Sequence, residues 1–153
     1  MNRWILSIGV LAAMSTDRAK QVTYFLLRVV AGLLFYQVGS MKLLGWFGGM
    51  PGQPGSTAPL MSQIGIGGAL EFFGGIAIML GVFTRPVAFI LSGEMAVAYW
   101  QFHAPNGAWP ILNHGEPAVL FCFIFLYMAA HGGGDWSLDA LIRRKRGGAI
   151  SPR

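Results

Sequence analysis

Residues 22–44 read VTYFLLRVVAGLLFYQVGSMKLL, a run that contains only two charged side chains, Arg28 and Lys42. Roughly 20 mostly apolar residues are enough for a helix to cross the hydrocarbon core of a bilayer. The two charged residues share one helix face with two glycines and a phenylalanine, because the five recur at steps of three or four; they are Arg28, Gly32, Phe35, Gly39 and Lys42. The stretch predicts a membrane span with ionisable groups on one side.

The composition of the whole chain is that of a membrane protein. Of its 153 residues, 54% are hydrophobic and 11% are charged, whereas about a quarter of the residues in a soluble domain are charged. The net charge of +5 does not indicate nucleic-acid binding, because long apolar stretches separate the basic residues. The single cysteine, Cys122, excludes an intrachain disulfide and a metal motif built from cysteines, so we expect no metal site.

Three further apolar segments follow the first, at residues 64–83, 86–102 and 117–130. The last two are short for spans, but the distribution of basic residues supports them. Lys and Arg lie in the N-terminal segment, in the turn around Arg85 and in the tail, and are absent from loops 45–63 and 101–116. Because basic residues favour the cytoplasmic side, we predict an all-α membrane protein: a four-helix transmembrane bundle with both termini cytoplasmic and with short interfacial helices at the N- and C-termini.

The predicted organisation has an N-terminal interfacial segment (1–21), a transmembrane domain (22–131) and a cytoplasmic basic tail (132–153) with a short amphipathic helix. Residues 4–14 are apolar but too few to span, and a signal peptide is the alternative interpretation of them. In the tail, Asp135 or Ser137 can cap the helix. The basic run that follows suits a surface of anionic lipid, with a solvated tail as the alternative.

The charges within the predicted spans need partners, because each costs at least about 2.5 kcal/mol in the centre of the bilayer. Arg28 and Glu94 lie at matching estimated depths, and the long Lys42 side chain can reach inward to Glu71. We therefore predict two ion pairs, Arg28 with Glu94 and Lys42 with Glu71. Glycines occupy the positions three and four residues on either side of Glu71, which allows another helix to approach closely. The pairs either fix helix register or line a polar pocket, and the sequence leaves both interpretations open.

A second polar group is expected at the outer surface, where His103, His114 and Glu116 lie in sequence near Trp109. Histidine titrates near physiological pH, so these side chains could pass protons or hydrogen-bond a quinone. For each histidine alone, a surface or capping role is the alternative. A position in a loop argues against haem ligation, which needs histidines on facing helices.

An ordered set of short motifs runs along most of the chain: Arg28-Val-Val-Ala-Gly32, Gly39-Ser-Met-Lys42, Glu71-Phe-Phe-Gly-Gly75, Glu94-Met-Ala96, Asn113-His114-Gly115-Glu116 and Trp136-Ser137-Leu138-Asp139. With the four-span layout, this set resembles the DoxX family of small bacterial membrane proteins. His114 departs from the commoner Asn-Gly-Gly-Glu run of that family. The resemblance implies a multi-pass protein of the bacterial inner membrane, similar to the membrane subunit of thiosulfate:quinone oxidoreductase.

The leading hypothesis is a quinone-interacting membrane subunit of a redox complex. Its expected proton-handling, catalytic residues are Glu71, Glu94, His114 and Glu116, and its expected quinone-binding residues are Arg28, Lys42, His103 and Trp109. The sequence contains no recognisable flavin, haem or iron–sulfur motif, so we expect the electrons to come from a partner protein. A non-catalytic anchor or assembly subunit of a larger membrane complex is the alternative. A small proton-coupled transporter is disfavoured, because no convincing inverted repeat is found. Whether the chain is itself an enzyme stays open.

Overall fold

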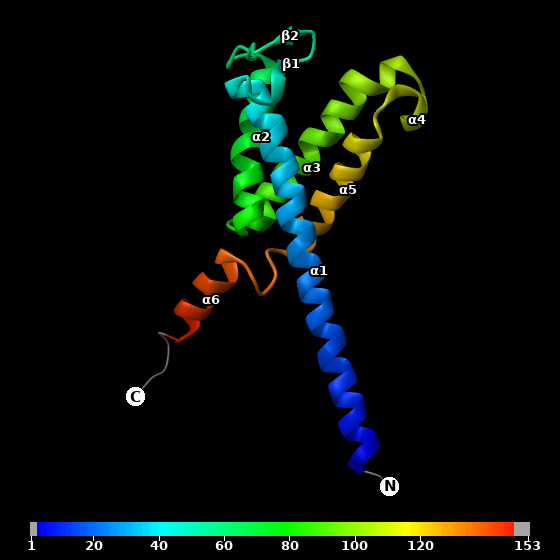
Figure 1. Ribbon diagram of the computed structural model, residues 1–153, viewed down its shortest axis with the longest axis vertical. Helices are drawn as coiled ribbons and strands as arrows, with labels where there is room; N and C mark the ends of the chain where they lie inside the picture. Colours follow the sequence, from blue (N-terminus) through cyan, green and yellow to red (C-terminus); the bar gives the residue numbers. More distant parts are fainter. Residues whose placement is uncertain (1–2, 149–153) are drawn as a thin grey trace.

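The structure, a computed structural model, describes residues 3–148 and the side chains of residues 16–146, and it is mostly helical. Helix α1 (Arg3–Leu44) is the longest and packs mainly against α2 (Gln63–Leu80), while α3 (Thr84–Ala98) packs mainly against α5 (Glu116–His131) and also contacts α2 (Figure 1). Because α1 is continuous from Arg3, the N-terminal segment predicted for residues 1–21 is not a separate helix. That segment and the predicted tail 132–153 both extend beyond the described residues.

The helices coincide with the four apolar segments of the sequence. Among the described residues, two helical stretches are long and apolar enough to cross a bilayer: Thr16–Leu44 of α1, and α2. Helix α5 is apolar but has 16 residues. Helix α3 has 15 residues and continues directly into η2 (Tyr99–His103), a π-helix of 5 residues. The two shorter helices thus each extend close to the length of a span only with the segments that adjoin them.

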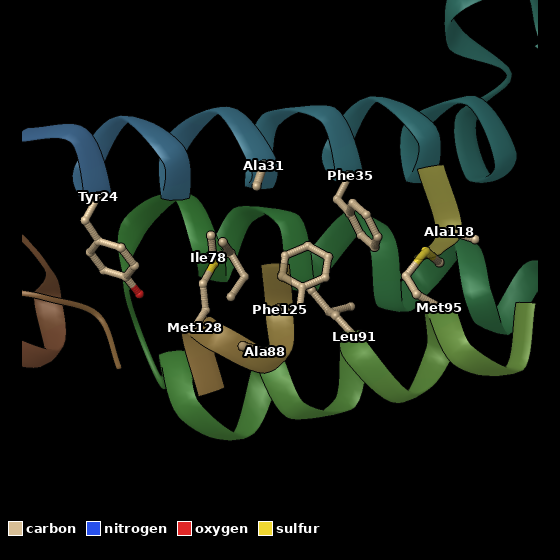
Figure 2. Close-up of a cluster of buried hydrophobic side chains, with 10 residues drawn as sticks. All are labelled: Tyr24, Ala31, Phe35, Ile78, Ala88, Leu91, Met95, Ala118, Phe125 and Met128. Carbon is tan, nitrogen blue, oxygen red and sulfur yellow. The ribbon is translucent and has the colours of Figure 1, made fainter. Parts of the chain in front are cut away.

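A core shared by all four helices holds them together, as Figure 2 shows. The Phe35 ring of α1 meets the rings of Phe121 and Phe125 on α5 edge-on, at centroid distances of 4.9 and 4.5 Å. Ile78 of α2 and Leu91 of α3 are buried in the same cluster. These contacts close α5 against α1, although the two helices are far apart in the sequence. Helices α1, α2, α3 and α5 therefore form one packed unit.

The outward surfaces of these helices are strongly apolar. Phe73 of α2, Phe89 of α3 and Phe123 of α5 are 66%, 67% and 64% exposed. Large aromatic side chains at such exposure are unfavourable in water but natural where lipid is the solvent. The structure therefore places apolar residues on both the inside and the outside of the helices, as a membrane protein requires.

Local signals set the ends of α2 and α3. Ser62 caps α2, because its side-chain oxygen accepts a hydrogen bond from the Gly65 amide at 3.0 Å. Gly81 ends the helix with φ of 67°, a left-handed conformation that glycine adopts without steric cost. Helix α3 begins three residues later, with Pro86 in its first turn. The predicted tight turn around Arg85 is thus the beginning of α3.

The outer loops carry short elements. Residues 45–62 contain η1 (Trp46–Gly48) and a small hairpin in which β1 (Gly49–Met50) pairs antiparallel with β2 (Gln53–Pro54). The second outer segment contains η3 (Ala104–Asn106) and α4 (Pro110–Asn113). Both segments lie at the end of the molecule opposite the two termini (Figure 1).

Helix α6 (Leu138–Gly148) diverges from the packed helices near the termini (Figure 1). The Ser137 side-chain oxygen accepts a hydrogen bond from the Ala140 amide at 3.1 Å, so the predicted cap of this helix is confirmed for Ser137. Asp135 instead accepts a hydrogen bond from the Gln21 side chain of α1 at 2.7 Å. The short C-terminal helix expected from the sequence is therefore present, and the segment just before it is hydrogen-bonded to α1.

Candidate functional site

The predicted Lys42–Glu71 ion pair is present between α1 and α2. The Lys42 Nζ atom lies 2.7 Å from Glu71 Oε1, and the two side chains are 22% and 5% exposed. Glycines make this approach possible: a Cβ added to Gly39 would lie 2.3 Å from the Phe72 amide nitrogen, and one added to Gly68 would lie 2.8 Å from Lys42 Cβ. The close helix contact predicted around Glu71 is thus confirmed.

Glu94 of α3 faces the same region of α2 from the other side. Its Oε1 atom lies 3.1 Å from the point that a Cβ on Gly67 would occupy. The charges of Glu71 and Lys42 both act on Glu94. Lys42, Glu71 and Glu94, on three different helices, therefore form one group, which we call the intramembrane triad.

Two oxygen atoms of the triad lack hydrogen-bond partners. Glu71 Oε2 and Glu94 Oε2 are both buried, and neither has a partner among the described residues. A buried polar atom without a partner is unfavourable, and the few that native structures contain call for an explanation such as a ligand, an ion or a proton. Both atoms are acceptors when their carboxylates are ionised, so they require donors.

An apolar groove runs along the seam between α2 and α3 and opens to the outside of the helices. Its volume is about 580 Å³, and its walls are apolar side chains of both helices, among them Leu70, Ile90 and Leu91. Ile90 and Leu91 lie four and three residues before Glu94, on the same face of α3. On α2, Leu70 lies three residues after Gly67, which Glu94 contacts. One end of this α2–α3 groove therefore lies within about one helical turn of Glu94, although no member of the triad lines it.

Arg28 does not pair with Glu94, so that prediction is wrong. The Arg28 guanidinium donates hydrogen bonds to the carbonyl oxygens of Ile78 at 2.6 Å, Met79 at 2.7 Å and Trp136 at 2.6 Å. It thus lies level with the C-terminal end of α2, where the carbonyl groups of the last turn lack helical partners and carry the negative end of the helix dipole. Glu94 lies ten residues beyond the start of α3, about 15 Å along the helix at 1.5 Å per residue.

The residues predicted for the outer polar group are only partly brought together. The His103 Nδ1 atom lies 3.0 Å from the carbonyl oxygen of Asn113, so one ring nitrogen holds the outer loop. His114 has φ of 56° between α4 and α5, and its side chain is exposed, as are those of Glu116 and Trp109. The structure describes no hydrogen bond that joins His103, His114 and Glu116 directly.

The end of the helices near the chain termini contains structural contacts that the residue spacing does not reveal. Asp139 of α6 accepts hydrogen bonds from the backbone amides of Phe83 and Thr84, each at 2.9 Å, and so caps α3 from a distant part of the chain. Burial alone would raise the pKa of Asp139, but these hydrogen bonds and the nearby Arg143 lower it below its usual range. The Tyr24 hydroxyl donates to the carbonyl oxygen of Gly132 in the same region.

Known proteins similar to this chain include one protein family and two bacterial relatives. The DoxX family profile matches residues 23–104, which include all three members of the triad. An uncharacterized protein of Haemophilus influenzae is 40% identical over 121 residues, covering 76% of this chain and 89% of the relative. The inner membrane protein YqjF of Escherichia coli is 28% identical over 141 residues, 84% of this chain and 98% of YqjF. No solved structure matches the chain.

Proposed function

The chain belongs to the DoxX family of membrane proteins, and from that premise we propose that it crosses the bacterial inner membrane four times with both termini in the cytoplasm. The similarity to an inner membrane protein supports the location. The two termini lie at one end of the molecule (Figure 1), as an even number of crossings requires. Loops 45–63 and 101–116, at the other end, contain no Lys or Arg, as expected outside the cytoplasm.

The lengths of the helices are compatible with four crossings. Helix α3 and the π-helix that follows it together run from Thr84 to His103, roughly 30 Å at about 1.5 Å per residue, the thickness of the hydrocarbon core. Helix α5, with 16 residues, covers about 24 Å, and the adjoining α4 can lie in the interface. In this arrangement the triad lies within the outer half of the membrane.

Within that membrane protein, the triad is the proposed binding site for a quinone that serves as the substrate of a redox complex. The observation that carries the proposal is the pair of partnerless buried oxygen atoms, Glu71 Oε2 and Glu94 Oε2, beside a groove that opens toward lipid. The two hydroxyl groups of a quinol are donors of the kind these acceptors require. In the oxidised form the substrate offers carbonyl acceptors, to which Lys42 can donate a second hydrogen bond while it holds Glu71.

The α2–α3 groove suits the hydrocarbon tail of such a substrate. Its walls are almost wholly apolar, and its volume of about 580 Å³ lies in the range of small-molecule sites. Interconversion of quinone and quinol moves two electrons and two protons. A partner protein would exchange the electrons, while Glu71 and Glu94 would exchange the protons and Lys42 would stabilise the carboxylate that has lost one. His114, Glu116, His103 and Trp109 are proposed to connect this site with the outer surface.

Arg28 is left out of the binding site in this proposal. It is 1% exposed, lies at the opposite end of α2 and has all its hydrogen bonds to backbone carbonyls. This structural use of a buried charge favours the second candidate function, a non-catalytic assembly subunit. In that case the triad would have the same purpose as Arg28, to fix helices in register.

One experiment separates the two functions. The protein would be purified in mild detergent, and its bound quinone would be extracted and quantified for wild type, Glu71→Gln, Glu94→Gln and Asp17→Asn. Asp17 is an exposed carboxylate outside the triad, 69% exposed on α1, and so serves as the matched control. Quinone in wild type and Asp17→Asn, with at least tenfold less in the two Glu variants, supports the binding site. Absence of quinone from every sample, or loss of a co-purifying partner protein alone, supports the assembly subunit.

A further inference from the structure

The intramembrane triad contains two carboxylates and one cation. Lys42 is within 2.7 Å of Glu71, and these two charges neutralise each other. Glu94 has no ion-pair partner among the described residues, in which Lys42 pairs with Glu71 and Lys20 pairs with Asp17. Arg28, the other buried cation, is occupied by carbonyl groups at the far end of α2. With both carboxylates ionised, the triad would carry a net charge of −1 away from water, which is strongly unfavourable.

A bound cation or proton removes this charge, and the available ligand atoms indicate which. Metal cations held by oxygen atoms take about six ligands or more. The triad offers two partnerless oxygen atoms, Glu71 Oε2 and Glu94 Oε2, and the described residues contain no group of three or more acidic, histidine or cysteine side chains that could hold a metal. A proton needs only one acceptor and one covalent bond to oxygen.

We propose that the triad holds one exchangeable proton, bound to Glu94 as a neutral carboxylic acid beside the Lys42–Glu71 ion pair. Binding converts the Glu94 carboxylate and one proton into the acid, and release reverses this without any transfer of electrons. Glu71 stays ionised because Lys42 contacts it directly. The inference concerns the same site as the proposed function but depends only on the charge count, so it stands whether or not a quinone binds there.

Among the charged groups near Glu94, Glu71 and Lys42 are those that affect its protonation state. Helix α5 also packs against α3, and its titratable groups are Glu116 at the exposed outer end, Cys122 beside Ser92, and Tyr127 and His131 toward the inner end. None of these four is among the groups that act on Glu94.

A polar contact lies between the triad and the nearer end of the α2–α3 seam. Gln63 of α2 lies four residues before Gly67, which Glu94 contacts, and its side-chain amide donates a hydrogen bond to Gln101 of the π-helix. Both glutamine side chains are exposed. They bridge the α2–α3 seam one to two helical turns from Glu94, on the side of the triad away from the chain termini.

The test is infrared spectroscopy of the protein in lipid nanodiscs, in which the spectrum of each variant is subtracted from that of wild type, both before and after extraction of quinone. A protonated carboxylic acid has a carbonyl stretching band that shifts in D₂O and is distinct from carboxylate bands. At neutral pH we expect one such band in wild type and in Asp17→Asn, and none in Glu94→Gln. Glu71→Gln should also lose it, because Lys42 is then free to neutralise an ionised Glu94. Lys42→Met should approximately double the intensity of this band, because both glutamates then need a proton.

Three results would overturn the inference. One is the absence of a protonated carboxyl band from wild type at neutral pH. Another is a band that persists in Glu94→Gln. The third is a band that sodium ions abolish at constant pH, which would assign the site to a metal cation. A band that survives quinone extraction supports the proton site even if the quinone proposal fails. If quinone is retained but no band exists, the quinone proposal stands and the proton site is rejected.

Discussion

Replacing Lys42 with methionine should destabilise the folded protein by about 3 kcal/mol. Breaking a buried ion pair by removal of one partner typically costs about 3–5 kcal/mol, because the other charge stays buried. The lower end of this energy range applies because Lys42 is 22% exposed and because Glu71 can take up a proton once Lys42 is removed. At about 1.4 kcal/mol per factor of ten, the folding equilibrium should shift roughly a hundredfold. The double variant Lys42→Met/Glu71→Gln should recover to within about 1 kcal/mol of wild type, because no buried charge is then left without a partner.

The assay is reversible unfolding in mixed micelles of increasing SDS content, followed by tryptophan fluorescence. Lys20→Met and Asp17→Asn/Lys20→Met form the matched control cycle, since Lys20 and Asp17 make an ion pair at 3.2 Å with both side chains about 70% exposed. Each control should change stability by less than about 1 kcal/mol, as exposed pairs do. The reasoning is refuted if Lys42→Met is no less stable than Lys20→Met, or if the double variant at the triad is as unstable as its Lys42 single variant.

Three further predictions concern contacts that hold the helices together and are checked by the same unfolding assay. Arg28→Lys should cost about 2–3 kcal/mol, because an ammonium group cannot hold three carbonyl groups in the planar geometry of a guanidinium; an unchanged stability would contradict this role. Gly75→Ala should cost about 1–3 kcal/mol, because its Cβ would lie 2.6 Å from the Tyr36 amide nitrogen, while Gly93→Ala, with open space around the new Cβ, should be neutral or stabilising by up to about 1 kcal/mol. Asp139→Asn should be less stable than wild type at neutral pH. Because the pKa of Asp139 is lowered in the folded state, its contribution is complete above the unfolded pKa of about 3.9 and disappears as the pH falls through the folded pKa, so a constant difference down to pH 2 would contradict the assignment.

The sequence predicted the Lys42–Glu71 contact because both determinants are local. Helical spacing places Lys42 on the packing face of α1, and the glycines around Glu71 show where α2 admits a close neighbour. The Arg28–Glu94 pair was wrong because its depth estimate rested on the start of the apolar run at residue 22. Helix α1 begins at Arg3, and its position relative to α2 is set by tertiary packing. The carbonyl groups that bind Arg28 have no signature in side-chain identity.

Other features depend on contacts between distant parts of the chain. Asp139 caps α3 from 55 residues away along the chain, and only the fold brings the two together. The α2–α3 groove likewise depends on how closely these two successive helices pack along their length, which only the fold determines. The outer hairpin could have been expected from its glycine and proline residues only as a turn, because its strands are two residues long. Residues such as His114 and Glu116 can be located from the sequence, but their exposure is a result of the fold.

Photoaffinity labelling with a short-chain quinone that carries a photoreactive group on its ring tests the central claim most directly. The labelled protein would be digested and the modified peptides identified by mass spectrometry. The account predicts modification within α2 and α3, near Gly67 and Glu94, which an excess of unmodified quinol prevents and which falls at least tenfold in Glu94→Gln but not in Asp17→Asn. Labelling confined to the outer segment around His114, or labelling of α2 and α3 that Glu94→Gln leaves unchanged, would contradict it.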